Sequence, residues 1–198
     1  MHCFCGFKMD RIKINKDEFY DCPNCQYLRR IDLVSPKLEK ERYDKHICDA
    51  SYIKYMESIY LEIEKYIYGN DILDYGCGQI HALSDILKEN GYNSDYYDLY
   101  YYPKLENRKY DTIILIEVFE HIANPVLELR KIKDMLNING RIIIATNFRA
   151  KELNNWWYLR DKTHVSIFSS DSIKYLSDKL GFKYEIIYER NLIILTSI

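Results

Sequence analysis

Hydrophobic residues between positions 71 and 198 recur with two periods that alternate along the chain. Apolar runs at residues 71–76 and 110–119 are typical of buried strands, and the second run is apolar on both faces. Between them, residues 80–91 carry four apolar side chains at helical spacing before a glycine stop. The chain therefore switches repeatedly between strand and helix patterns.

The same alternation continues to the carboxyl terminus. Residues 125–140 and 169–181 have a helical period, whereas residues 93–100 and 141–148 have the pattern of strands. Residues 182–198 predict a closing hairpin. Strands that alternate with helices predict an α/β fold built on a doubly wound, mostly parallel sheet.

The first third of the chain has a different pattern. Residues 7–22 predict two short strands around a polar turn, and residues 36–68 have a helical pattern that ends at Gly69. We therefore expect two domains, a small module at residues 1–32 and an α/β domain at residues 33–198.

Composition narrows the class of protein. The formal net charge of −2 gives no overall attraction to nucleic acid. No apolar run approaches about 20 residues, so no membrane span is expected, and the N-terminus lacks a hydrophobic signal region. These features predict a cytoplasmic location, in which the six cysteines stay reduced.

The stretch "DYGCG" at residues 74–78 predicts a tight turn that holds a ligand against the backbone. A dinucleotide site requires a third glycine three residues after Gly78, and His81 occupies that position. Asp74 stands two residues before the first glycine, and an acid at this position suits a cationic ligand that carries an ammonium group. S-adenosylmethionine is therefore favoured over a dinucleotide.

Asp98 strengthens this interpretation, because it ends the second predicted strand, 24 residues after Asp74. A carboxylate at that position accepts hydrogen bonds from two ribose hydroxyls. A solvated turn residue is the alternative role for Asp98.

These motifs resemble those of the class I S-adenosylmethionine-dependent methyltransferases. "ILDYGCG" is similar to their first motif, "YDTIILIEVFEHIANP" to their fourth-strand segment, and "LNINGRIIIAT" to a later strand entry, with Asn139 replacing a glycine. "RYDKH" and "WWYLRDKTHVSIFSSDSIKYLSDKLGF" further resemble a subgroup of the methyltransferase-23 type, whose members also share a short cysteine-rich lead. The resemblance covers roughly residues 40 to 198.

The resemblance implies a Rossmann-like sheet of seven strands and S-adenosylmethionine as cofactor. It implies that Asp74, Gly76 and Gly78 line the amino-acid end of the cofactor and that Asp98 binds its ribose. Glu117 and Val118 are expected beside the sulfonium and adenine, and Leu99 against the adenine. Tyr43 and His46 are expected in a segment that closes over the cofactor. Ordinary core packing is the alternative role for Leu99, Glu117 and Val118. For Tyr43 and His46, the alternative is a solvated helix start.

Two histidines are candidate catalytic bases. His121 follows Glu120 at the end of the fourth-strand segment, and His164 ends the long loop at residues 149–164, which is expected to overhang the acceptor. A neutral imidazole has a pKa near working pH, so it can accept a proton from an attacking hydroxyl. The alternative for His121 is a structural role in ordering the loop.

Four cysteines in the N-terminal module predict a structural zinc site, formed by Cys3, Cys5, Cys22 and Cys25. "CPNC" has the usual spacing of two residues, but only one residue separates Cys3 from Cys5. His2 restores the usual spacing and is an alternative ligand to Cys3. A metal-free remnant of a zinc ribbon is the other interpretation.

Three functions remain open at this stage. The first is a methyltransferase that acts on a small molecule through an oxygen or carbon nucleophile. The second is an RNA or protein methyltransferase whose zinc-ribbon-like module binds the substrate. Residues 1–30 carry six basic and four acidic side chains, a net charge of only +2. The third is a cofactor-binding protein without catalysis.

Overall fold

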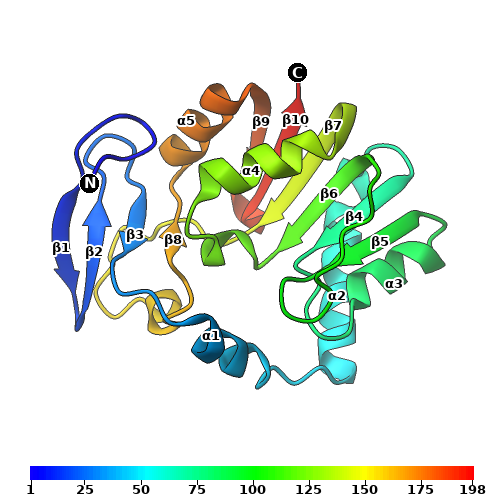
Figure 1. Ribbon diagram of the computed structural model, residues 1–198, viewed down its shortest axis with the longest axis horizontal. Helices are drawn as coiled ribbons and strands as arrows, with labels where there is room; N and C mark the ends of the chain where they lie inside the picture. Colours follow the sequence, from blue (N-terminus) through cyan, green and yellow to red (C-terminus); the bar gives the residue numbers. More distant parts are fainter.

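The computed structural model describes residues 1–198 and contains two sheets (Figure 1). The larger sheet has the strand order β5-β4-β6-β7-β10-β9. Its first four strands are parallel to one another, and β10 runs antiparallel to both of its neighbours. The bounds are β4 Asp71–Tyr75, β5 Asn93–Tyr97, β6 Tyr110–Ile116, β7 Leu136–Ala145, β9 Phe182–Ile187 and β10 Leu192–Ser197.

The predicted α/β fold is confirmed, with six strands in this sheet rather than seven. Only residues 98–109 connect β5 to β6. A crossover between parallel strands takes a dozen or more residues and usually a helix, so this connection has no room for an additional strand.

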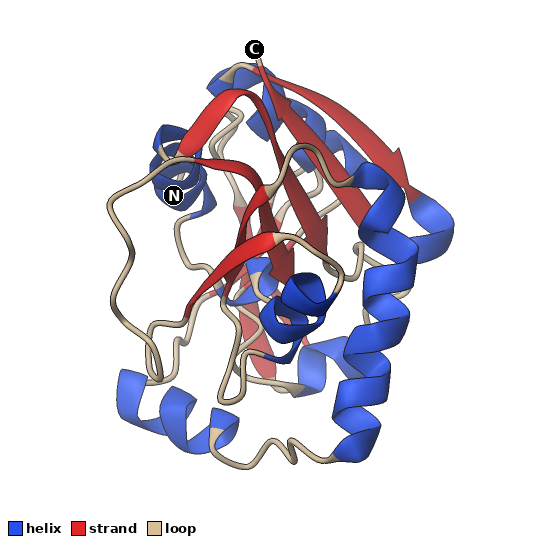
Figure 2. Cartoon of the chain, turned by 90° about the vertical axis from the view of Figure 1, so that its right-hand side faces the viewer, coloured by secondary structure: helices blue, strands red, loops and turns tan.

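Helices cover both faces of the sheet, as Figure 2 shows from the side. Alternate residues of β6 point to opposite faces, so Ile113 and Leu115 join one core cluster while Ile114 and Ile116 join the other. The first cluster lies under α4 and α5, and the second lies under α2 and α3. The bounds are α2 Ala50–Ile63, α3 Ala82–Glu89, α4 Pro125–Asp134 and α5 Ser170–Leu180.

Two predicted helices have different bounds in the structure. The helix predicted at 125–140 ends at Asp134, because residues from Leu136 onward pair with β6 as part of β7. The helix predicted at 36–68 is divided into α1 (Pro36–Tyr43) and α2, which begins after the capping side chain of Asp49. His46 therefore lies in the turn between two helices.

The smaller sheet joins the N-terminal residues to a distant segment. Its order is β1-β2-β3-β8, and β8 comes from the chain that follows the long loop. Tyr158 and Leu159 of that loop are buried against Phe19 and Leu28 of the small sheet. The bounds are β1 Asp10–Ile14, β2 Asp17–Asp21, β3 Leu28–Arg30 and β8 Ser166–Ile167.

Four short 3-10 helices complete the fold, and the second lies at the carboxyl end of β6. They are η1 (Glu64–Tyr66), η2 (Phe119–His121), η3 (Trp157–Arg160) and η4 (Tyr188–Arg190). No helix combines the length and the apolar character that crossing a bilayer requires.

Candidate functional site

The glycine turn between β4 and α3 lies at the carboxyl ends of the parallel strands. Gly76 and Cys77 both donate backbone hydrogen bonds to the carbonyl of Tyr97, at 2.7 and 3.0 Å. Gly76 has φ +85°, and a Cβ at this position would lie 2.4 Å from Val118 Cγ2. Gly78 has φ +70° and no atom within 4 Å of the corresponding point. The turn is thus packed tightly on one side and open on the other.

Asp98 anchors the open side of this turn. Its carboxylate accepts the backbone N–H groups of Gly78 at 3.1 Å, Tyr100 at 2.8 Å and Tyr101 at 3.1 Å. Asp98 and Gly78 are therefore together, as the ribose interpretation requires. Leu99, in contrast, is 63% exposed, so its side chain is not packed in the core.

Asp74 is almost completely buried beneath the turn, and its Oδ2 atom has no hydrogen-bond partner. The pKa of Asp74 is raised to about 7, mainly by burial; a backbone N–H from Ser84 opposes this shift, and the negative charge of Asp98 adds to it. Asp74 lines a cavity of about 10 Å³ together with Tyr52 and Met56 of α2. An unpaired carboxylate oxygen beside open glycine backbone fits the ammonium end of S-adenosylmethionine.

Glu117 and Val118 follow the last residue of β6, directly beside the turn. Glu117 has φ +52°, a left-handed conformation that is uncommon for a residue with a side chain. This conformation lets the backbone leave the sheet and lead into η2 while Val118 packs on Gly76. Partial desolvation and the neighbouring carboxylate of Glu120 raise the pKa of Glu117 above its ordinary value.

The long loop brings His164 to His121 and Glu120, two residues of η2. The rings of the two histidines are 4.9 Å apart. Nδ1 of His121 lies 3.0 Å from the carbonyl of Thr163, and Nδ1 of His164 lies 2.8 Å from the carbonyl of Tyr158. Burial, and then the proximity of His121, lowers the pKa of His164, which favours a neutral imidazole.

The α1 segment crosses from the glycine turn to this histidine pair. The ring of Tyr43 is 5.4 Å from that of His121, and its carbonyl accepts a hydrogen bond from Gln79 at 2.9 Å. Arg42 forms a 2.9 Å ion pair with Asp161 of the long loop. His46 lies beside Tyr43, with the two rings 6.0 Å apart. The structure thus gathers Tyr43 and His46 over the candidate site.

The four N-terminal cysteines form one cluster. Sγ atoms of Cys3 and Cys25 are 3.5 Å apart, as are those of Cys5 and Cys22. Tetrahedral zinc with thiolate ligands at about 2.3 Å sets sulfur atoms roughly 3.8 Å apart, so the cluster fits such an ion. His2 is exposed and outside the cluster, which favours Cys3 as the fourth ligand.

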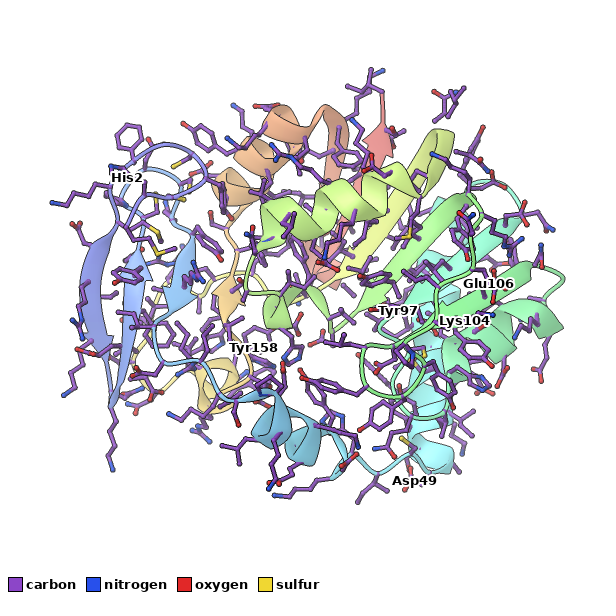
Figure 3. The ribbon with its side chains drawn as sticks, viewed as in Figure 1. His2, Asp49, Tyr97, Lys104, Glu106 and Tyr158 are labelled. Carbon is purple, nitrogen blue, oxygen red and sulfur yellow. The ribbon has the colours of Figure 1, made fainter.

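Sequence reasoning assigned no role to two residues of the site, Glu120 and Thr146. The Glu120 side chain is fully buried and accepts a hydrogen bond from Thr146 at 2.9 Å. The Tyr158 hydroxyl contacts Thr146, and Figure 3 shows Tyr158 between the two sheets. The available signal in the sequence was that Glu120 directly precedes His121. Residue spacing does not reveal, however, that the Glu120 side chain is buried.

Comparison with known proteins places this geometry in context. A family model described as a methyltransferase domain matches residues 24–186. No curated protein sequence gives a significant match.

Several solved structures are similar to this chain. A 1,6-didemethyltoxoflavin-N1-methyltransferase from Burkholderia thailandensis, solved with S-adenosylhomocysteine, has a TM-score of 0.60 at 11% identity, covering 96% of this chain and 99% of that one. A SAM-dependent methyltransferase from Archaeoglobus fulgidus has a TM-score of 0.57 at 15% identity, covering 81% of this chain and 99% of that one. A magnesium protoporphyrin IX methyltransferase from Synechocystis has a TM-score of 0.52 at 14% identity, covering 83% of this chain and 95% of that one. At these identities the likeness shows the fold.

Proposed function

The chain belongs to the methyltransferase domain family, and from this premise we propose that it transfers the methyl group of S-adenosylmethionine to a small-molecule acceptor. The attacking atom of the acceptor is an oxygen or a carbon. The observation that carries the cofactor assignment is the buried, unpartnered Oδ2 of Asp74 beneath an open glycine turn. A cation that carries hydrogen-bond donors satisfies this oxygen, whereas a diphosphate would be repelled by it.

In this proposal the cofactor lies across the carboxyl ends of β4, β5 and β6. Asp74 binds the ammonium group, Gly76 and Gly78 let the amino-acid end approach the backbone, and Asp98 accepts the ribose hydroxyls. Val118 and Glu117 lie beside the adenine and the sulfonium. Two structural neighbours with TM-scores of 0.60 and 0.52 were solved with S-adenosylhomocysteine bound, which supports this choice of cofactor.

The bound cofactor supplies a methyl group that is already strongly electrophilic. The chain must align the acceptor with that group and exclude water. His121 and His164 are the candidate bases, because each holds Nδ1 against a backbone carbonyl and leaves Nε2 free to accept a proton. The loop at residues 149–164 and α1 enclose the acceptor between them.

The four-cysteine cluster is proposed to bind a structural zinc ion. The thiols Cys3, Cys5, Cys22 and Cys25 lie within 4.8 Å of one another, a closed set of four sulfur donors. Such a site has no open position for substrate, so its contribution is to the stability of the small sheet.

No observation favours RNA as the substrate of this module. Arg30 is buried and donates to the carbonyls of His164, Leu159 and Asp161, and Arg11 is paired with Glu18. These arginines are committed to internal contacts, so they offer little to phosphates.

Binding and turnover test the proposal separately. Calorimetry is expected to show S-adenosylmethionine binding that Asp74→Ala abolishes, and a pool of small hydroxylated metabolites is expected to yield S-adenosylhomocysteine. Absence of cofactor binding overturns the proposal. Binding without turnover on any acceptor supports a non-catalytic cofactor-binding protein, and turnover only on RNA or protein supports the macromolecular alternative.

A further inference from the structure

Three side chains with metal-binding chemistry meet at the end of β6, apart from the cysteine cluster. They are Glu120 and His121 of η2 and His164 of the long loop. One ligand atom from each lies within 4.8 Å of the other two. Two imidazole nitrogens and one carboxylate oxygen are a donor set that divalent zinc accepts.

The orientation of each side chain is already fixed by a second contact. Nδ1 of His121 and of His164 each faces a backbone carbonyl, which requires the proton on Nδ1 and leaves the lone pair on Nε2. The Oε2 atom of Glu120 accepts from the Thr146 hydroxyl. In protein metal sites, ligating histidines and carboxylates are held by outer hydrogen bonds of this kind.

The second carboxylate oxygen of Glu120 remains without a partner in this arrangement. The residue is fully buried, and its Oε1 atom has no hydrogen-bond partner. An unpartnered carboxylate oxygen is unfavourable at a buried position, and a cation bound by it and by the two neighbouring imidazoles satisfies it.

Proton transfer alone does not explain the cluster. One attacking group needs one base, whereas the structure presents two imidazoles side by side, together with a buried carboxylate. A tetrahedral cation with three protein ligands keeps a fourth position open, which is the arrangement of zinc sites that act on a bound oxygen.

We propose that Glu120, His121 and His164 form a second metal site, for a zinc-like divalent cation, through Oε1 of the glutamate and Nε2 of each histidine. The open position takes a hydroxyl oxygen of the acceptor, a role that rests on the proposed methyltransferase function. With their Nε2 atoms bound to the cation, both histidines act as ligands rather than as bases. The acceptor hydroxyl then loses its proton to solvent, its oxygen forms the bond to the methyl carbon, and the electron pair of the carbon–sulfur bond stays on sulfur. The acceptor is thereby restricted to hydroxyl compounds such as phenols.

Metal loading of the full-length chain tests the site without reference to activity. After metal is stripped by a chelator, titration with zinc is expected to give two ions per wild-type chain and one in Glu120→Gln or His121→Asn. With cobalt, Cys22→Ser weakens the thiolate charge-transfer absorption, and Glu120→Gln removes only the weaker bands of a nitrogen and oxygen site.

Two further variants sharpen the test. Thr146→Val removes the outer hydrogen bond to Glu120, so zinc affinity at the second site is expected to fall about 10- to 100-fold while both ions still bind at saturation. His2→Asn is the matched control, because this exposed histidine lies outside both clusters, and it is expected to keep both ions. Circular dichroism of each variant verifies that the chain is folded.

The inference is overturned if folded Glu120→Gln and His121→Asn bind as much metal as wild type, or if the wild-type spectrum shows thiolate ligands alone. Calorimetry with S-adenosylmethionine on the same samples distinguishes the two proposals. Cofactor binding with no second ion contradicts only the metal site, and a second ion with no cofactor binding contradicts only the methyltransferase mechanism.

Discussion

At the scale of single residues, two aspartates on neighbouring strands have opposite environments. Asp98 is held by three backbone N–H groups. Asp74 is buried with one oxygen unpaired. Asp98 therefore stabilises the turn without a ligand, whereas Asp74 has an oxygen that a ligand with hydrogen-bond donors can satisfy.

Asp74 makes both stability and cofactor affinity depend on pH. Its folded pKa of about 7 lies above the unfolded value of 3.8, so the folded chain binds the proton more tightly and stability falls as pH rises through this window. The loss approaches about 1.4 kcal/mol per pH unit. Asp74→Asn is expected to be more stable than wild type at pH 8 but not at pH 4, as measured by thermal unfolding.

Cofactor affinity is expected to change in the opposite direction. The ammonium group requires ionised Asp74, so calorimetry should show affinity rising about tenfold per unit up to pH 7 and then levelling. Asp74→Asn should bind weakly at every pH. An affinity for wild type that is flat from pH 5 to 8 would remove Asp74 from the cofactor site.

Asp98→Asn removes the charge of Asp98 and also alters its role in the turn. Both carboxylate oxygens accept backbone N–H groups, and the amide replaces one of them by an NH2 group that cannot accept. The charge-assisted bonds to ribose are lost as well, so S-adenosylmethionine should bind about 10- to 100-fold more weakly. Asp95→Asn is the matched control, because this acid of β5 pairs with Arg108 away from the turn. Equal affinities in both variants would contradict the ribose role.

At the scale of elements, the site depends on three connections rather than on strands or helices. They are the glycine turn after β4, the left-handed step from β6 into η2, and the long loop that carries His164. The α1 segment spans them through Tyr43 and Arg42. The cavity of about 10 Å³ at Asp74 is lined by Tyr52 and Met56 of α2, and it is far smaller than the roughly 300 Å³ of a site that holds a whole ligand.

The two glycines of the turn should respond differently to alanine. Both have positive φ, which costs about 1–2 kcal/mol for alanine, but only the Gly76 Cβ would collide with Val118. Gly76→Ala should therefore be the less stable variant in denaturant titrations. Gly78→Ala should fold with a modest loss and still fail to bind cofactor, because its methyl group occupies the open side. Equal stability of the two variants would contradict the packing argument.

At the scale of the whole molecule, the N-terminal module is continuous with the main core. Cys3, Cys22 and Cys25 are buried in the same cluster as Phe168 and Ile173, which lie at the start of α5. Ser169 donates to the carbonyl of Cys25 at 2.7 Å, and β8 completes the small sheet. The boundary near residue 32 stays a prediction, but the packing ties the two parts together.

Removal of the proposed zinc should consequently destabilise the entire chain. Cys22→Ser, or a strong chelator, is expected to lower the melting temperature by at least about 10 °C in a single transition, since a structural metal contributes several kcal/mol. Cys48→Ser is the control, because Cys48 lies outside the cluster. Two separate transitions, with the second unchanged, would show that the module unfolds alone.

The sequence by itself determined the order of strands and helices and the turn that carries Asp74, Gly76 and Gly78. Both depend on local features, since apolar periodicity and a glycine pair act through neighbouring residues. The sequence also placed Asp74 and Asp98 at the ends of two neighbouring strands. Because these strands are parallel, their carboxyl ends lie at one edge of the sheet. The same local rules failed at residues 136–140, where pairing with β6 replaced helix by strand.

Only the tertiary structure decided which distant residues meet. His164 reaches His121 across 43 positions because Tyr158 and Leu159 of its loop bury their side chains against the small sheet. No spacing rule encodes that contact, since it depends on packing between segments far apart in the chain. The burial of Glu120 and its unpaired oxygen follow from the same packing.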